Sequence, residues 1–252
     1  MCSYELLVGM NHRELDFRSP AEFIPVAERS KLVVPLGGWV LKVACAQNKA
    51  WSDAGLDPIK VAVNLSAVQF REERLVDVIK ETLEETGLEA EQLELEITES
   101  LAMRNADVTI DLCGQISELG VSLSIDDFGT GYSSLSYLKK FPVQRIKIDK
   151  AFVDDIDEEE NSGVIARAVT MLGHSFGMEI TAEGVETEVQ LSFLRSLGCD
   201  EIQGYYFSRP LPGNELEEFL RNFEDTRAIR LSQERRQGGR DRRDQPKAQS
   251  AP

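Results

Sequence analysis

The chain has 252 residues, of which 42% are apolar and 29% are charged, enough to form the core of one large domain or two small ones. It has neither a run of ~18 uninterrupted apolar residues nor a basic-then-apolar leader, so we exclude a membrane-spanning or secreted protein and expect a cytoplasmic one. The net charge of −16 repels long nucleic acids, and a chain of this charge that handles phosphates needs cations between itself and them.

Strand-like and helical segments alternate along the chain. Period-two alternation predicts strands near residues 2–8, 59–66, 93–99, 121–127, 145–149, 179–184 and 201–207. Amphipathic patterns predict helices near residues 38–52, 73–87, 104–119, 133–140, 160–176, 187–197 and 214–223. In addition, Ser19-Pro20-Ala21-Glu22 is predicted to be a capping box that starts a helix at Pro20.

This alternation amounts to seven βα repeats. It predicts an α/β fold, a parallel-stranded barrel of the TIM type, and an open doubly wound sheet fits the pattern almost as well. The four cysteines, Cys2, Cys45, Cys113 and Cys199, are far apart and form no CxxC pair, so we expect reduced structural thiols.

The end of the chain differs in composition from the rest. From Thr226 onward there are eight basic and three acidic residues, a net charge of +5, which leaves about −21 for the preceding body. Few residues in this segment are apolar, so its burial cannot offset the entropy of folding. We therefore predict one domain over residues 1–225 and a disordered basic tail over 226–252, with a nucleic-acid or membrane patch as the alternative for the tail.

Alternate side chains of each predicted strand point to opposite faces. In "VSLSIDD", Val121, Leu123 and Ile125 share an apolar face, and the opposite face ends in Asp126. In the other strands the corresponding polar positions, near the end that leads into a loop, are Glu5, Asn64, Glu96, Lys147, Glu183 and Gln203. In a barrel, these side chains would converge at the carboxyl-terminal mouth, where active sites of this fold lie.

Such convergence would concentrate negative charge. Taken singly, each acid is more often a solvated strand end or a helix cap, so the prediction depends on their coincidence. Together, Glu5, Glu96, Asp126, Asp127 and Glu183 would face the single charge of Lys147. Such a site must bind cations or stay protonated, and carboxylate ligands without His or Cys favour Mg²⁺ or Mn²⁺ over Zn²⁺. Two neighbouring aspartates can serve two ions, the usual arrangement for displacement at phosphorus.

Eight motifs resemble the EAL domain family in order and spacing. They are "ELL" at 5–7, "FIPVAE" at 23–28, "VNLS" at 63–66, "ELEITES" at 94–100, "DDFGTGYSSLSYL" at 126–138, "KIDK" at 147–150, "AEGVET" at 182–187 and "QGYYFSRPL" at 203–211. The family comprises bacterial phosphodiesterases of cyclic di-GMP. The resemblance implies a modified TIM barrel, two Mg²⁺ or Mn²⁺ ions, hydrolysis of the cyclic dinucleotide to linear pGpG, and a homodimer.

The resemblance also implies roles for particular residues. One metal would be held by Glu5, Asn64, Glu96 and Asp126, and the second by Asp126, Asp127 and Glu183. Lys147, catalytic together with Asp126, Asp127 and Glu183, would contact the attacking water or the phosphate as a base or an electrostatic stabiliser. Gln203 would help to fix the water or the metal ligands. Glu99 and Glu186 resemble the family's acids that hold the loop after Asp127, in which Gly129, Thr130 and Gly131 bear on metal binding and dimer contacts.

Two features depart from the family pattern. Where the family has Arg after its Glu-Ala-Leu, this chain has Gly9, which removes a bidentate phosphate contact. The strand that precedes Glu5 in the family, with its substrate-contacting Gln, is missing here, so we expect a barrel that lacks its first strand. The leading hypothesis is a metal-dependent cyclic di-GMP phosphodiesterase; a non-hydrolysing cyclic di-GMP receptor or interaction module, or another carboxylate-metal barrel enzyme such as one of the enolase type, remains open.

Overall fold

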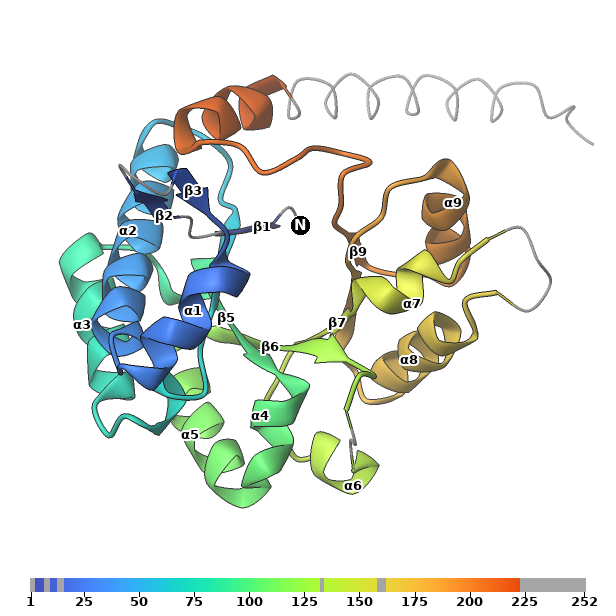
Figure 1. Ribbon diagram of the computed structural model, residues 1–252, viewed down its shortest axis with the longest axis horizontal. Coiled ribbons are helices and arrows are strands. Elements are labelled where there is room, and N and C mark those ends of the chain that lie inside the picture. Colours follow the sequence, from blue (N-terminus) through green and yellow to red (C-terminus); the bar gives the residue numbers. More distant parts are fainter. Residues whose placement is uncertain (1–2, 7–9, 13–15, 132–133, 158–161, 223–252) are drawn as a thin grey trace, which may run out of the picture. The chain divides into compact units, whose positions relative to one another are not determined.

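The computed structural model describes residues 3–6, 10–12, 16–131, 134–157 and 162–222. Contacts divide the chain into two units, Met1–Pro210 and Leu211–Pro252. Every strand and helix labelled in Figure 1 belongs to the first unit, and residues 213–222 are helical in the second. Gly9 and the predicted tail 226–252, with its boundary, lie outside the described residues. In the described ranges, each helix is too short or too polar to cross a membrane.

Seven parallel strands form the main sheet (Figure 1). In spatial order they are β1 (Ser3–Glu5), β4 (Lys60–Asn64), β5 (Leu93–Thr98), β6 (Ser122–Phe128), β7 (Arg145–Ile148), β8 (Glu179–Ala182) and β9 (Glu201–Ile202). Each strand pairs with the next one in this order, so spatial and chain order coincide. A doubly wound sheet would reverse its order at a switch point. The sheet curls instead, and the modified TIM-type fold is confirmed.

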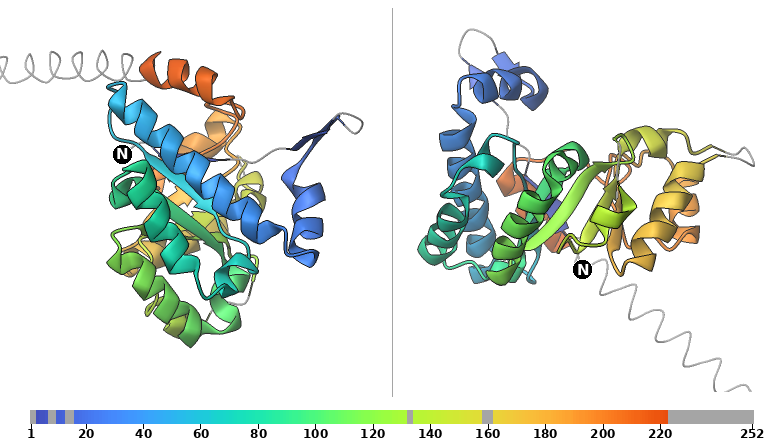
Figure 2. Two further views of the ribbon diagram at one scale, coloured as in Figure 1. Left: turned by 90° about the vertical axis from the view of Figure 1, so that its left-hand side faces the viewer. Right: turned by 90° about the horizontal axis from the view of Figure 1, so that it is seen from below.

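Helices connect the strands, and most of them cover the outer face of this sheet. They are α1 (Pro20–Arg29), α2 (Val33–Asp53), α3 (Leu75–Thr86), α4 (Glu99–Arg104), α5 (Ala106–Glu118), α6 (Leu135–Leu138), α7 (Lys150–Asp154), α8 (Val164–Ser175) and α9 (Glu188–Ser196), with short 3-10 turns η1 (Gln69–Arg71) and η2 (Ala90–Gln92). Strands β2 (Met10–His12) and β3 (Asp16–Arg18) form an antiparallel hairpin. Figure 2 shows this hairpin and α1 to one side of the barrel sheet.

The predicted elements differ from the structure mainly at their ends. The helix predicted over 104–119 is α5, which begins at Ala106 because Asn105, with a φ of −141° and a ψ of 65°, is not helical. The strand predicted over 201–207 ends at Ile202, and the helix predicted from residue 38 begins at Val33. The β2–β3 hairpin, α4 and α7 were not predicted. These elements are three to six residues long, too short to show a period in the sequence.

The predicted capping box at the start of α1 is wrong, although the helix does begin at Pro20. The Ser19 side chain does not accept from the backbone of the first turn, and its hydroxyl donates instead to Glu22 Oε1 at 3.5 Å. A complete capping box is present at α9, where Thr187 and Gln190 satisfy each other's backbone amides. The cysteine thiols of Cys45, Cys113 and Cys199 are free, as the sequence predicts.

Both faces of the central strands are buried. The outward-facing Leu95, Ile125 and Ile146 are fully covered by helices. The inward-facing Glu96 and Lys147, with only 2% of their surface exposed, are polar instead. The outer layer therefore supplies the apolar core, and the barrel interior consists of polar and charged side chains that must satisfy one another.

The turn after β9 lies directly on the loop after β8, and Gly204 permits this approach. The Val185 amide donates to the Gln203 carbonyl at 3.0 Å, and the Tyr206 amide donates to the Val185 carbonyl at 2.9 Å. A Cβ on Gly204 would lie only 2.2 Å from the Val185 carbonyl oxygen. Only a residue without a side chain fits between these two segments of backbone.

We predict that Gly204→Ala lowers the free energy of unfolding by about 1–3 kcal/mol, because backbone atoms cannot yield as a flexible side chain can. The control is Gly114→Ala in α5, where a Cβ would meet nothing within 4 Å. This substitution should raise the free energy of unfolding by up to ~1 kcal/mol, since alanine is the better helix former. Urea unfolding measures both, and a neutral Gly204→Ala would contradict the close approach.

Candidate functional site

Carboxylates from four strands surround the amino group of Lys147 inside the barrel. Lys147 Nζ lies 2.7 Å from Glu96 Oε2 on β5 and 2.5 Å from Glu183 Oε1, just after β8. It lies 3.5 Å from Asp126 Oδ1 on β6 and 3.6 Å from Glu5 Oε2 on β1. Parallel strands all end at one mouth, so residues far apart in the sequence meet there. We name these five residues the Lys147 cluster.

Two amides join this cluster across the ends of the sheet. Asn64 Nδ2 on β4 donates to Glu5 Oε1 at 2.6 Å, and Gln203 Nε2, just after β9, donates to Glu5 Oε2 at 2.9 Å. In the described residues, β1 and β9 are the two edges of the sheet and share no backbone hydrogen bond. The Gln203–Glu5 contact therefore bridges the seam of the barrel by side chains.

Asp127 joins its neighbour Asp126 because β6 is irregular at this point. The β6–β7 register shifts between Ile125 and Phe128, and Asp127 has a φ of +55°. The left-handed conformation costs a residue with a Cβ roughly 1–2 kcal/mol. In a regular strand, Asp127 would point away from Asp126. The bulge thus brings adjacent carboxylates toward one site, and the Asp127 amide donates to Asp126 Oδ1 at 2.9 Å.

Asp149 also belongs to this region, and it was absent from the predicted site. Its carboxylate caps α7 by accepting from the Ala151 amide at 2.8 Å. Burial, then Asp126, and then a hydrogen bond with Asp149 raise the pKa of Asp127 to about 6. Asp149 is two residues after Lys147, so the period-two alternation that identified Lys147 could have identified it.

Glu99 holds the loop that follows β6. Its buried Oε2 accepts from the amides of Gly129 at 2.7 Å and Gly131 at 3.2 Å. The hydroxyl of Thr130 donates to the Asp127 carbonyl at 2.8 Å, which links this loop to the bulge. In contrast, Glu186 pairs with Lys150 at the start of α7.

Burial shifts the pKa values of the Lys147 cluster. It raises the pKa of Glu96 to about 8, opposed by Lys147 and reinforced by Glu5 and Asp126. It raises the pKa of Glu183 to about 7, again opposed by Lys147 and reinforced by Asp126. Burial would lower the pKa of Lys147, but the four carboxylates outweigh this effect and raise it well above its ordinary value. The lysine therefore stays charged, and the four carboxylates share its single positive charge.

The donor set suits a divalent cation. In the described part of the chain, no three His, Cys, Asp or Glu side chains are arranged to hold a metal ion as they stand, and Lys147 lies among the carboxylates. One lysine cannot neutralise the cluster together with Asp127, and two like charges ~4 Å apart repel by about 4 kcal/mol at an effective dielectric of ~20. Carboxylate and amide oxygens are the ligands that Mg²⁺ and Mn²⁺ prefer, so the residues fit such an ion.

Fold and site together define a parallel α/β barrel with a cluster of carboxylates at its mouth. The chain belongs to the EAL domain family, which matches residues 1–210. Among its relatives is the bifunctional diguanylate cyclase/cyclic di-GMP phosphodiesterase MucR of Pseudomonas aeruginosa, 44% identical over 86% of this chain and 32% of that protein. Another is the cyclic di-GMP phosphodiesterase NbdA of the same organism, 45% identical over 87% of this chain and 28% of that protein. The chain thus spans about a quarter to a third of the length of these curated relatives.

Solved structures agree with the family assignment. A structure of the P. aeruginosa MucR phosphodiesterase in complex with c-di-GMP superposes with a TM-score of 0.83 at 44% identity, over 86% of this chain and 87% of that one. The EAL domain of Mycobacterium smegmatis DcpA superposes with a TM-score of 0.70 at 38% identity, over 74% of this chain and 84% of that one.

The bulge at Asp127 makes a prediction that does not depend on activity. Asp127→Gly should have a free energy of unfolding about 1 kcal/mol higher than Asp127→Ala, because glycine adopts a positive φ without steric cost. At the exposed position Glu85 in α3, the order should reverse, with Ala more stable than Gly by about 1 kcal/mol. Chemical denaturation of the four variants measures this, and the same order at both positions would argue against a left-handed Asp127.

Proposed function

We propose that this chain is a metal-dependent phosphodiesterase that hydrolyses cyclic di-GMP to linear pGpG. The observation that carries the proposal is the gathering of Glu5, Glu96, Asp126 and Glu183 around Lys147, at the mouth of a barrel that matches the MucR phosphodiesterase structure. The substrate is a cyclic dinucleotide with two phosphodiester linkages. Its negative charge would be repelled by the carboxylates unless cations lie between them.

Two Mg²⁺ or Mn²⁺ ions would be held by the residues of this mouth. Glu5, Asn64, Glu96 and Asp126 would hold one, and Asp126, Asp127 and Glu183 the other. When bound, such ions neutralise the phosphate and make a water molecule a stronger nucleophile. A carboxylate that binds an ion would no longer accept a hydrogen bond from Lys147. One N–H of the Lys147 amino group would then be available to a substrate oxygen.

Lys147 acts as an electrostatic stabiliser in this proposal. The surrounding carboxylates raise its pKa well above the ordinary value, so it is charged at neutral pH and cannot accept a proton. Its amino group donates to the phosphate as negative charge develops there. The attacking water would form a bond to phosphorus and give up a proton, the bond to the 3′ oxygen would break, and that oxygen would take up the proton. Gln203 and Asn64 orient Glu5, and Glu99 holds the loop that carries Asp127 toward the site.

Chromatography of the products tests the proposal. Purified protein with Mg²⁺ should convert cyclic di-GMP to pGpG, and Glu183→Ala should lower turnover by at least about 100-fold, the size of effect expected for loss of a group that acts in the transition state. Glu85→Gln, which removes an exposed carboxylate on α3, should leave turnover unchanged. Tight binding without product would favour the non-hydrolysing receptor, which Gly9 in the sequence supports. If the protein neither binds cyclic di-GMP nor forms product, both functions are refuted.

We also propose that the chain forms a homodimer through the outer face of α8. Val164 and Met171 are 61% and 67% exposed and lie seven residues apart on this helix, with Ala168 between them on the same stripe. A second copy of the chain would cover these apolar side chains. Met171→Glu should shift the mass measured by light scattering from dimer to monomer, whereas Asp111→Asn on exposed α5 should not. A monomeric wild-type protein would count against this surface.

The remaining expectations from the sequence concern the cellular location of the protein and the carboxyl-terminal end of the chain. The cytoplasmic location, the domain boundary near residue 225 and the disorder of the basic tail 226–252 stay predictions. Proteolysis of the purified protein would remove the tail first if it is disordered.

A further inference from the structure

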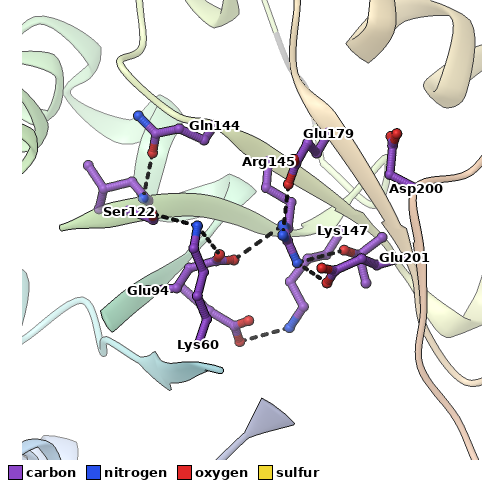
Figure 3. Close-up of polar contacts among 12 residues, drawn as sticks. Lys60, Glu94, Ser122, Gln144, Arg145, Lys147, Glu179, Asp200 and Glu201 are labelled. Carbon is purple, nitrogen blue, oxygen red and sulfur yellow. Dashed lines mark hydrogen bonds and ion pairs between the residues drawn. The ribbon is translucent and has the colours of Figure 1, made fainter. Parts of the chain in front are cut away.

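A second charged cluster lies in the same barrel, nearer the amino-terminal ends of the strands (Figure 3). We name it the Arg145 cluster; it consists of Lys60, Glu94, Ser122, Arg145, Glu179 and Glu201. Along its strand, each member lies two or four residues before a residue of the mouth. Arg145 precedes Lys147, Glu94 precedes Glu96, and Glu201 precedes Gln203 by two residues, which places each pair on the same inward face.

Arg145 connects three strands besides its own. Its Nε lies 3.6 Å from Glu94 Oε1 on β5, and its Nη2 lies 2.8 Å from Glu179 Oε2 at the start of β8. Its Nη1 pairs with Glu201 on β9 and donates to Thr181 Oγ1 at 3.3 Å. On the other side, Lys60 on β4 donates to Ser122 on β6 at 2.8 Å and lies 3.9 Å from Glu94. The guanidinium thus spans the interior from β5 to β9.

The charges of the Arg145 cluster nearly balance, unlike those of the Lys147 cluster. Two cations, Lys60 and Arg145, face the carboxylates of buried Glu94 and partly buried Glu201, and the third carboxylate, Glu179, has a side chain that is 58% exposed. Burial would lower the pKa of Arg145, but Glu94 and Glu201 outweigh it and raise the pKa. The cluster therefore needs no further cation, and its role is to hold strands rather than to bind a metal.

The strand that most needs such support is β9. It has two residues and pairs with β8 alone in the described sheet. Backbone bonds fix β9 to β8 but leave the distance between β9 and β1 open, because no ladder joins those edges in the described residues. The link from Glu94 through Arg145 to Glu201 ties β9 to β5 across the interior. It thereby fixes how far the sheet curls at the position from which Gln203 reaches Glu5.

We propose that Arg145 is a positioning residue of the candidate phosphodiesterase site: by holding Glu94 and Glu201 across the barrel interior, it places Gln203 against Glu5 at the mouth. This inference rests on the proposed function for its kinetic readout. It concerns the seam of the barrel, and it assigns Arg145 no contact with substrate.

Two variants distinguish an effect of Arg145 on the site from an effect on the stability of the fold. Arg145→Met removes the buried cation that pairs with Glu94 and Glu201, so it should unfold at lower denaturant concentration than the wild type. The double variant Arg145→Met/Glu201→Met removes one charge of each sign, leaves Lys60 opposite Glu94, and should keep the wild-type unfolding midpoint. The double variant should therefore lack the link between β5 and β9 while keeping the stability of the wild type.

In the double variant, Mn²⁺ affinity measured by calorimetry without substrate should fall about 10-fold, since Glu5 loses a partner that orients it. The kcat should fall about 10- to 100-fold with little change in KM, as expected for displaced ligands. In a Gln203→Ala background, the same two substitutions should lower neither the Mn²⁺ affinity nor the kcat any further. The reason is that the double substitution and Gln203→Ala disturb the same contact, the one between Gln203 and Glu5. Glu85→Gln serves as the control in each assay.

Wild-type Mn²⁺ affinity in the double variant, or losses that add fully to those of Gln203→Ala, would overturn the inference and leave the Arg145 cluster a purely structural one. If the wild-type protein binds Mn²⁺ but gives no pGpG, the proposed function fails, and the metal affinities still decide the role of Arg145. A wild-type protein that binds no Mn²⁺ would overturn both.

Discussion

Excess negative charge inside the barrel mouth is the constraint on which the rest of the site depends. Lys147 is buried among Glu5, Glu96, Asp126 and Glu183, and each carboxylate loses solvation in exchange for a share of one amino group. Burial drives carboxylate pKa values upward here, toward neutral forms. A divalent cation relieves the same repulsion without protons, which is why this arrangement suits a metal-dependent reaction on a phosphate.

The barrel interior separates two tasks along its axis. Near the amino-terminal ends of the strands, Arg145 and Lys60 offset their carboxylates, and the resulting contacts hold strands together. At the mouth, the charge balance is incomplete, and we propose that this part binds the ions and the substrate. A spacing of two or four residues on each strand separates the two groups, so the same strands carry both the balanced cluster and the acidic mouth.

The backbone is least regular where the site is built. The bulge in β6 gives Asp127 a positive φ, Glu99 holds the glycine-containing loop that follows, and Gly204 allows the turn after β9 to lie on the loop after β8. A regular barrel would direct alternate side chains inward and outward, and it could not turn two consecutive aspartates to one side. The irregular segments cost conformational free energy, which the regular helices and strands around them offset.

The sequence alone determined the seven strands, the inward positions of Glu96, Asp126 and Lys147, and the family, because period-two alternation and local motifs are written in short stretches of chain. The strand–helix alternation by itself left the barrel and the doubly wound sheet both open, the family resemblance implied the barrel, and both missed Asp149 and the Arg145 cluster. Strand order, the bulge at Asp127 and the partners of Arg145 were decided only by the tertiary structure. The physical reason is that a side chain's charge balance depends on neighbours that lie dozens of residues away in sequence and meet only when the sheet curls.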